Sequence, residues 1–135
     1  MVNDSPIAWH SGYQSTVSLS TYESEYMAMS AGVQHSYLIK WLKDDINQMS
    51  SVIHTFTDNE KLVQSLQSGS ILGSRRVRHL LLNCAWLREK MGLKEINVSH
   101  IKGVTNYADI FTKPLPKPAF EKHCTKLLHN LGSTP

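Results

Sequence analysis

The stretch that decides the fold is Ser20-Thr21-Tyr22-Glu23-Ser24-Glu25-Tyr26-Met27-Ala28-Met29. Ser20 and Glu23 are three residues apart and match a capping box, in which each side chain satisfies an unpaired backbone N–H of the first helical turn. A helix is therefore predicted to begin here. Its apolar positions are spaced by four, three and four residues, which places them on one stripe facing a core. These positions are Tyr22, Tyr26, Met29 and Val33, with Leu38, Trp41 and Leu42 expected to continue the buried face.

Two acids lie in the first turns of this helix. Helical geometry places Glu25 on the edge of the apolar stripe, whereas Glu23 is expected to point away from it. An inward carboxylate is costly to bury unless it is paired, and a metal ion is one such partner. The alternative is that Glu25 only interacts with the positive end of the helix dipole.

Length and composition indicate one globular domain spanning residues 1–135. The chain is 41% hydrophobic and 19% charged, which is typical of a folded protein and not of a disordered one. No apolar run approaches the roughly 18 residues of a membrane span, and the first residues lack the basic and apolar regions of a secretory signal. Cys84 and Cys124 lack metal-ligand spacing. We therefore expect an intracellular protein, in the cytoplasm or nucleus, with reduced thiols and no membrane partner.

The net charge of +3 conceals an asymmetry between the two halves of the chain. Residues 1–67 hold three lysines and seven acids, whereas residues 68–135 hold eleven basic residues and four acids. This distribution suggests an anionic partner for the second half. The residues expected to contact phosphates are Arg75, Arg76, Arg78, Arg88, Lys90, Lys94 and Lys102, and the alternative is an ordinary solvated helix face.

Strand patterns alternate with helix patterns along the chain, which predicts an α/β fold. Residues 7–19 resemble a strand or a bent hairpin, and the helix that starts at Ser20 should run to about Lys43. The next expected elements are a strand at 52–57, a helix at 60–67 and a helix at 77–91 with Gly92 as its C-cap. A strand at 94–101 and a helix opening near Asn106 follow. The last expected element is an amphipathic helix that ends at Gly132 and carries Phe120, Leu127, Leu128 and Leu131.

Three acids lie at the start of a predicted helix or at the end of a predicted strand. Glu25 is early in the first helix, Asp58 ends a strand, and Asp109 follows another strand in the first turn of a helix. In open α/β sheets, ligands bind beyond the carboxyl ends of the strands. Clustered carboxylates there suit Mg²⁺, and two such ions can cleave a phosphodiester. The alternatives are that Asp58 is a helix N-cap and that Asp109 is a partner of the helix dipole.

Tryptophan has two possible uses in this chain. Trp9, Trp41 and Trp86 could stack on nucleic-acid bases, but the residues around them favour core packing.

Three blocks of the sequence resemble the signature blocks of the ribonuclease H domain at the end of copia-type retrotransposon polyproteins. The blocks are Leu19-Ser20-Thr21-Tyr22-Glu23-Ser24-Glu25-Tyr26, Thr57-Asp58-Asn59, and Asn106-Tyr107-Ala108-Asp109-Ile110-Phe111-Thr112-Lys113-Pro114-Leu115-Pro116. Arg76-Val77-Arg78-His79 is similar to the family's basic block, and Pro6-Ile7-Ala8-Trp9 to the segment before its third strand. The resemblance covers about residues 5–131, which leaves 132–135 as a tail.

The resemblance implies hydrolysis of the RNA strand of an RNA–DNA hybrid with two Mg²⁺ or Mn²⁺ ions. Glu25, Asp58 and Asp109 match the second, third and fourth family carboxylates. The first family carboxylate has no counterpart here, so weak metal binding and weakened hydrolysis are expected. The alternative is a non-catalytic, domesticated module that binds nucleic acid or protein on the same scaffold.

The resemblance also implies a ribonuclease H-like mixed sheet flanked by helices, truncated by the loss of its first two strands. Without them, residues 7–19 would expose a row of unpaired backbone groups. We therefore expect this strand to pair either within a rearranged sheet or with a second copy in a homodimer.

Overall fold

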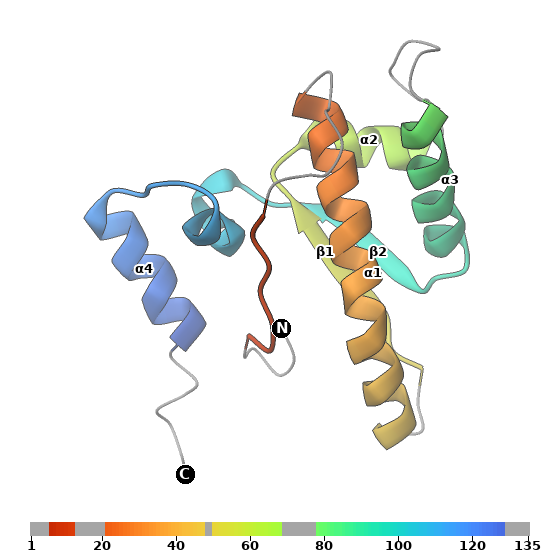
Figure 1. The fold of residues 1–135 in the computed structure, drawn as a ribbon, viewed down its shortest axis with the longest axis horizontal. Coiled ribbons are helices and arrows are strands. Elements are labelled where there is room, and N and C mark those ends of the chain that lie inside the picture. The colour runs from red at the N-terminus through yellow and green to blue at the C-terminus, as the bar shows by residue number, and fades with distance from the viewer. Residues whose placement is uncertain (1–5, 13–20, 48–49, 69–77, 129–135) are drawn as a thin grey trace. The chain divides into compact units, whose positions relative to one another are not determined.

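The computed structural model describes residues 6–12, 21–47, 50–68 and 78–128, which fall into two compact units (Figure 1). The larger unit contains α1 (Thr21–Asn47), β1 (Ile53–Thr57), α2 (Glu60–Ser68), α3 (Arg78–Gly92) and β2 (Ile96–His100). The smaller unit contains residues 6–12 together with the 3₁₀ helices η1 (Gly103–Thr105) and η2 (Tyr107–Phe111) and the helix α4 (Lys117–Leu128). The predicted mixture of helices and strands is confirmed.

The larger unit is built on a parallel pair of strands. β1 pairs with β2 in a register that places Ile53 opposite Ile96 and Thr57 opposite His100. Two parallel strands need a long crossover, which α2 and α3 provide. The strands predicted at 52–57 and 94–101 are thus confirmed. Alternation buries Ile96 and Val98 in the core.

The buried face of α1 follows spacings of three and four residues. This period of 3.5 is the one that keeps a helix face against a packed neighbour. The predicted stripe is confirmed at Tyr26, Met29 and Val33, which are buried, and at Tyr22, which packs against them. The buried positions that alternate three and four apart are Glu23, Tyr26, Ser30, Val33, Tyr37 and Lys40. Polar side chains therefore share this face with apolar ones.

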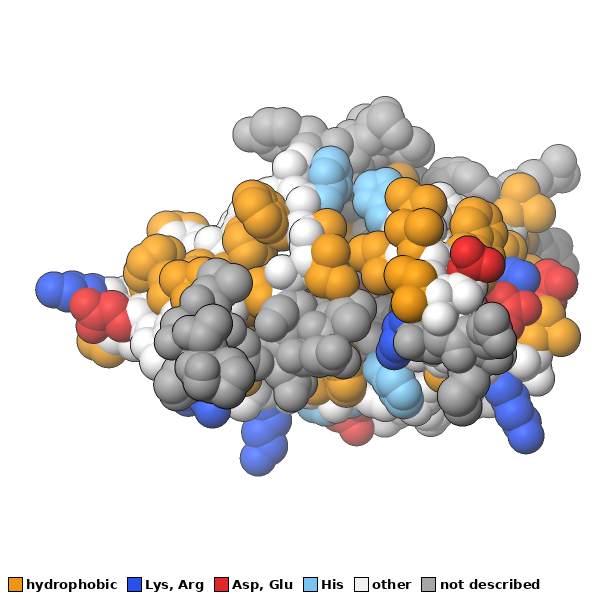
Figure 2. Space-filling model, turned by 90° about the horizontal axis from the view of Figure 1, so that it is seen from below, with side chains coloured by type: hydrophobic (Ala, Val, Ile, Leu, Met, Phe, Trp, Pro, Cys, Tyr) orange, Lys and Arg blue, Asp and Glu red, His pale blue; other side chains and the backbone are white. Residues whose placement is uncertain are grey.

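The predicted continuation of the buried face at Leu38, Trp41 and Leu42 is wrong, because all three side chains are exposed. The buried side of α1 continues through Tyr37 and Lys40 instead. At about 100° per residue, Leu38 and Leu42 face away from this side of the helix and Trp41 lies at its edge. Figure 2, seen from the end where α1 finishes, shows exposed hydrophobic side chains beside charged ones.

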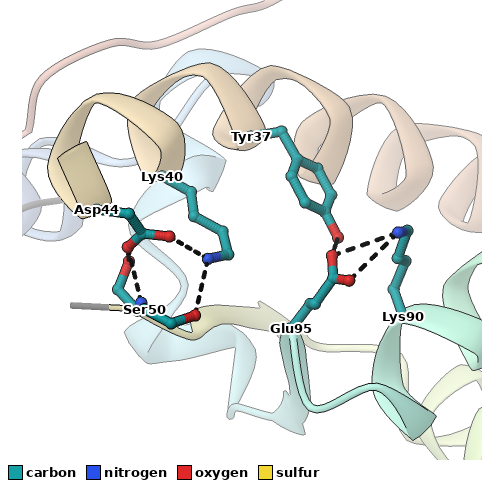
Figure 3. Close-up of polar contacts among 7 residues, drawn as sticks. Tyr37, Lys40, Asp44, Ser50, Lys90 and Glu95 are labelled. Atoms are coloured by element: carbon teal, nitrogen blue, oxygen red, sulfur yellow. Dashed lines mark hydrogen bonds and ion pairs between the residues drawn. The ribbon is translucent and has the colours of Figure 1, made fainter. Parts of the chain in front are cut away.

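One polar network ties the end of α1 to the segment that leads into β1 (Figure 3). Lys40 forms an ion pair with Asp44 one turn later. The other oxygen of the Asp44 carboxylate accepts hydrogen bonds from the Ser51 backbone N (2.7 Å) and the Ser51 Oγ (2.5 Å). Lys40 and then Ser51 lower the pKa of Asp44 to about 2. This carboxylate therefore stabilises the fold above its ordinary pKa, and the contribution is lost as the pH falls toward 2.

A second network joins α1 to the turn between α3 and β2 (Figure 3). The Tyr37 Oη donates to Glu95 Oε2 at 2.6 Å, and Lys90 Nζ lies 3.3 Å from the same carboxylate oxygen. The Tyr37 hydrogen bond is the main reason why the pKa of Glu95 is lowered. Glu95 thereby links the edge of the sheet to the middle of α1.

The left-handed residue that ends α3 differs from the predicted one. Lys94 has a φ of 58°, its N–H donates to the Met91 carbonyl, and the Glu95 N–H donates to the Lys90 carbonyl. These two bonds form a Schellman motif whose left-handed position is Lys94. The prediction of Gly92 as the C-cap is therefore wrong, because the helix continues through Gly92 and turns two residues later.

The chain termini differ from their predicted forms where they are described. Residues 6–12 form no strand, so that part of the predicted strand at 7–19 is wrong, and 13–19 lie outside the described residues. The predicted last helix is present as α4, but it buries Leu127 and leaves Phe120 and Leu128 exposed. Its predicted end lies outside the described residues.

Within the described part of the chain, no helix combines the length and the apolar character needed to cross a membrane.

Two leucines of the larger unit, one buried and one exposed, allow a test of the packing. Leu62 is fully buried among α1, α2 and α3, whereas Leu42 is exposed on α1. We expect Leu62→Ala to lower the free energy of unfolding by roughly 2–5 kcal/mol. Leu42→Ala should change it by less than about 0.5 kcal/mol. Urea unfolding followed by circular dichroism measures both, and equal losses would contradict the packing described here.

The Tyr37–Glu95 hydrogen bond predicts a pH-dependent effect. Because the pKa of Glu95 is lowered by folding, its contribution to stability is present above its ordinary pKa near ~4.3 and is lost as the pH falls through the folded value. Tyr37→Phe should therefore cost roughly 1 kcal/mol at pH 7 and less at pH 3. Urea unfolding at several pH values tests this, and a cost independent of pH would contradict it.

Candidate functional site

Asp58 lies at the carboxyl end of β1, directly before α2. The N-cap position of α2 is held by Asn59, whose side-chain oxygen accepts a hydrogen bond from the Leu62 backbone N at 3.2 Å. Asn59 is itself held by a bond from its backbone N to Thr57 Oγ1 at 3.1 Å. The capping bond to Leu62 thus does not need the Asp58 carboxylate, which is partly buried at the end of the strand.

Glu25 lies in the first turns of α1 and is partly buried. Glu23, which was expected to point away from the core, is only 7% exposed, so that prediction is wrong. The reason is that Glu23 is three residues before Tyr26 and seven before Ser30, both of which are buried on the same face of the helix. The capping box itself includes Ser20, which lies outside the described residues.

The start of α1 lies at the end of the larger unit where β1 finishes (Figure 1). The Tyr26 and Ser65 hydroxyl groups, which are 2.5 Å apart, join α1 to α2. The Tyr22 hydroxyl is 3.5 Å from that of Tyr26. Since α2 follows directly after Asp58, this contact places Glu25 and Asp58 at the same end of the unit. Burial raises the pKa of the Tyr26 phenol, so the group is a neutral hydrogen-bonding partner at pH 7.

Cys84 lies beside the Tyr26 hydroxyl. Its side chain is fully buried in the core, and burial raises the pKa of its thiol. Cys84 and Cys124 are both free cysteines. Cys84 therefore belongs to the core of the larger unit.

Asp109 belongs to the smaller unit. The helix predicted near Asn106 is present as the short helix η2, and the Asn106 side chain accepts a hydrogen bond from the Ala108 backbone N at 3.3 Å. The Asn106 side-chain amide donates to Asp109 Oδ1 at 3.1 Å, and Lys113 Nζ lies 3.0 Å from the same oxygen. Both contacts therefore reach the same oxygen of the Asp109 carboxylate.

The three predicted metal ligands are divided between the two units. Glu25 and Asp58 are in the larger unit, and Asp109 is in the smaller one. Among the described residues of each unit, no group of three His, Cys, Asp or Glu side chains is close enough to hold a metal ion. The donors themselves are carboxylate oxygens, which are the ligands that Mg²⁺ and Mn²⁺ prefer.

The predicted phosphate-binding residues have different surroundings. Arg88 Nη2 donates to the Ser65 carbonyl at 2.7 Å, so part of its guanidinium binds the last turns of α2. Lys102 is exposed. Arg78 begins α3, and nothing is described of its side chain. Arg75 and Arg76 lie outside the described residues.

Two of the three tryptophans are not packed in a core. Trp9 is 72% exposed and Trp41 is 64% exposed, which contradicts the prediction of core packing for both. Trp86 is partly buried against the core, as predicted. The sequence analysis did not identify Phe111 as a functional residue. In the structure, the Phe111 ring is parallel to the Trp9 ring within 10°, at a centroid distance of 6.3 Å. The available sequence signal was that Phe111 lies in the same signature block as Asp109.

Comparison with known proteins indicates an origin in a mobile element. Over 117 residues, 85% of this chain, the sequence is 30% identical to the retrovirus-related Pol polyprotein from transposon TNT 1-94 of Nicotiana tabacum. This similarity supports a protein derived from a retrotransposon Pol polyprotein. The chain spans 8% of the length of that relative. No protein-family model matches the sequence, and no solved structure matches the chain.

The end of β1 provides a prediction that separates capping from function. We expect Asn59→Ala to lower the free energy of unfolding by about 1 kcal/mol, because it removes the hydrogen bond to the first turn of α2. Asp58→Asn should change it by less than about 0.5 kcal/mol. Thermal unfolding of both variants measures the difference. A larger loss in Asp58→Asn than in Asn59→Ala would show that Asp58 is needed for the fold.

Proposed function

We propose that this protein is a retrotransposon-derived ribonuclease H-like domain that hydrolyses the RNA strand of RNA–DNA hybrids. The observation that carries the proposal is the position of Asp58. It ends a parallel strand, its neighbour Asn59 caps the next helix, and Glu25 lies at the same end of the unit. The similarity to a retrotransposon Pol polyprotein and the resemblance of the three signature blocks support the proposed reaction.

Glu25 and Asp58 are the residues of the larger unit that would hold Mg²⁺ or Mn²⁺, and Asp109 of the smaller unit matches the fourth family carboxylate through its signature block. When bound, a pair of such ions activates water and stabilises the leaving oxygen of a phosphodiester. The chain's own contribution is to supply negative carboxylates whose positions are fixed by a strand end, a helix start and the contacts of Asn106 and Lys113. Lys113 pairs with Asp109 and would have to leave it for a cation to bind there.

Substrate affinity would come from basic side chains such as Arg75, Arg76 and Lys102, and it should fall steeply with salt.

A non-catalytic role is the second candidate. The ion pair between Asp109 and Lys113 favours it, because a lysine already satisfies one proposed metal ligand. In this case the same scaffold would bind nucleic acid or protein without hydrolysing it.

Cleavage of an end-labelled RNA–DNA hybrid in Mg²⁺ or Mn²⁺ distinguishes the two candidates. We expect slow, EDTA-sensitive cutting that falls by roughly 100-fold or more in Asp58→Asn and in Glu25→Gln, because each removes a proposed metal ligand. Asp45→Asn is the matched control, since Asp45 is an exposed acid on α1 that has no proposed role. It should cut at the rate of the unaltered protein.

The unfolding measurements above show whether a silent variant is folded. Absence of cutting by the folded, unaltered protein would reject the hydrolytic function and leave the binding role. Cutting that survives Asp58→Asn would reject the proposed ligand set.

A further inference from the structure

Trp9 and Phe111 form an exposed aromatic pair in the smaller unit. Trp9 is 72% exposed and Phe111 is 40% exposed, and their rings are stacked within 10° of parallel. Tryptophan is the largest apolar side chain, and leaving it in water forfeits the stabilisation that burial would give. Among the described residues, the Trp9 ring stacks on Phe111, and much of the indole surface stays open to a ligand.

The pair is held in place by its surroundings. The Ser11 Oγ donates to the Phe111 carbonyl oxygen at 2.9 Å, which ties the segment of Trp9 to the end of η2. η2 is itself fixed at its start by the Asn106 cap. A ligand that stacks on rings already ordered loses less conformational entropy than one that must order them.

Positive charge dominates the same unit. Among its described residues, Asp109 and Glu121 are the two acids, and both contact lysines, Lys113 at 3.0 Å and Lys117 at 3.8 Å. The lysines of the unit are Lys102, Lys113, Lys117, Lys122 and Lys126. Lysines attract the phosphates of a nucleic acid without selecting its sequence.

We propose that Trp9 and Phe111 stack on the bases of single-stranded nucleic acid while lysines of the same unit bind its phosphates. Every base has a flat face, so stacking on aromatic side chains tolerates any sequence, and an unpaired strand presents those faces. A duplex keeps its bases stacked on one another and offers the pair much less. The site lies within the smaller unit and does not depend on the proposed hydrolysis.

Fluorescence anisotropy of a labelled oligothymidine, in EDTA and low salt, tests this binding. Because oligothymidine contains no RNA and EDTA removes metal ions, the result is independent of cleavage. We expect Trp9→Ala to weaken binding roughly tenfold and Trp9→Phe, which keeps an aromatic ring, to weaken it much less. Lys117→Met should reduce the slope of log affinity against log salt by about 0.7, whereas Trp9→Ala should leave the slope unchanged.

Trp41→Ala is the matched control. Trp41 is similarly exposed but lies on α1 in the larger unit, so its loss should leave the affinity unchanged. Three results would overturn the proposal: no binding of oligothymidine by the unaltered protein, the same affinity in Trp9→Ala, or an equal loss in Trp41→Ala. The last result would indicate that the protein binds the label through any exposed tryptophan.

Discussion

The packing of α1 across the parallel pair of strands is the constraint on which the larger unit depends. Two five-residue strands bury too little surface to be stable alone, so the core needs helices on them. Tyr26, Val33 and Leu62 lie at the centre of this core, and the hydroxyl of Tyr26 finds a partner on α2. The same packing places the start of α1 at the end of β1, where Asp58 and Glu25 lie. The proposed chemistry therefore uses positions that the fold already fixes.

Local patterns in the sequence predicted the elements well where the cause is local. The start of α1, both strands and the opening at Asn106 were predicted from capping patterns and alternation in the sequence, and all of these elements are present. The prediction of Gly92 as the C-cap was wrong because glycine is frequent at helix ends but is not required there. Here Lys94 takes the left-handed conformation instead, and that turn brings Glu95 to Tyr37.

Burial was predicted less well because it depends on what lies opposite a side chain. Leu42 and Trp41 follow the apolar spacing of α1, but the buried side of the helix runs through Tyr37 and Lys40 and leaves both side chains exposed. Trp9 was expected in a core and is instead open beside Phe111. Of the candidate site, the sequence predicted the positions of Asp58 and Glu25 on their elements, but it could not reveal that Asn59 caps α2 or that Lys113 pairs with Asp109.

The central claim is that Glu25 and Asp58 hold a divalent cation. Calorimetric titration of Mn²⁺ into the folded protein tests this claim most directly, because it needs neither substrate nor turnover. We predict a saturable heat of binding that is lost in Asp58→Asn and Glu25→Gln and retained in Asp45→Asn. Absence of binding to the unaltered protein, or binding that Asp58→Asn leaves unchanged, would contradict the account.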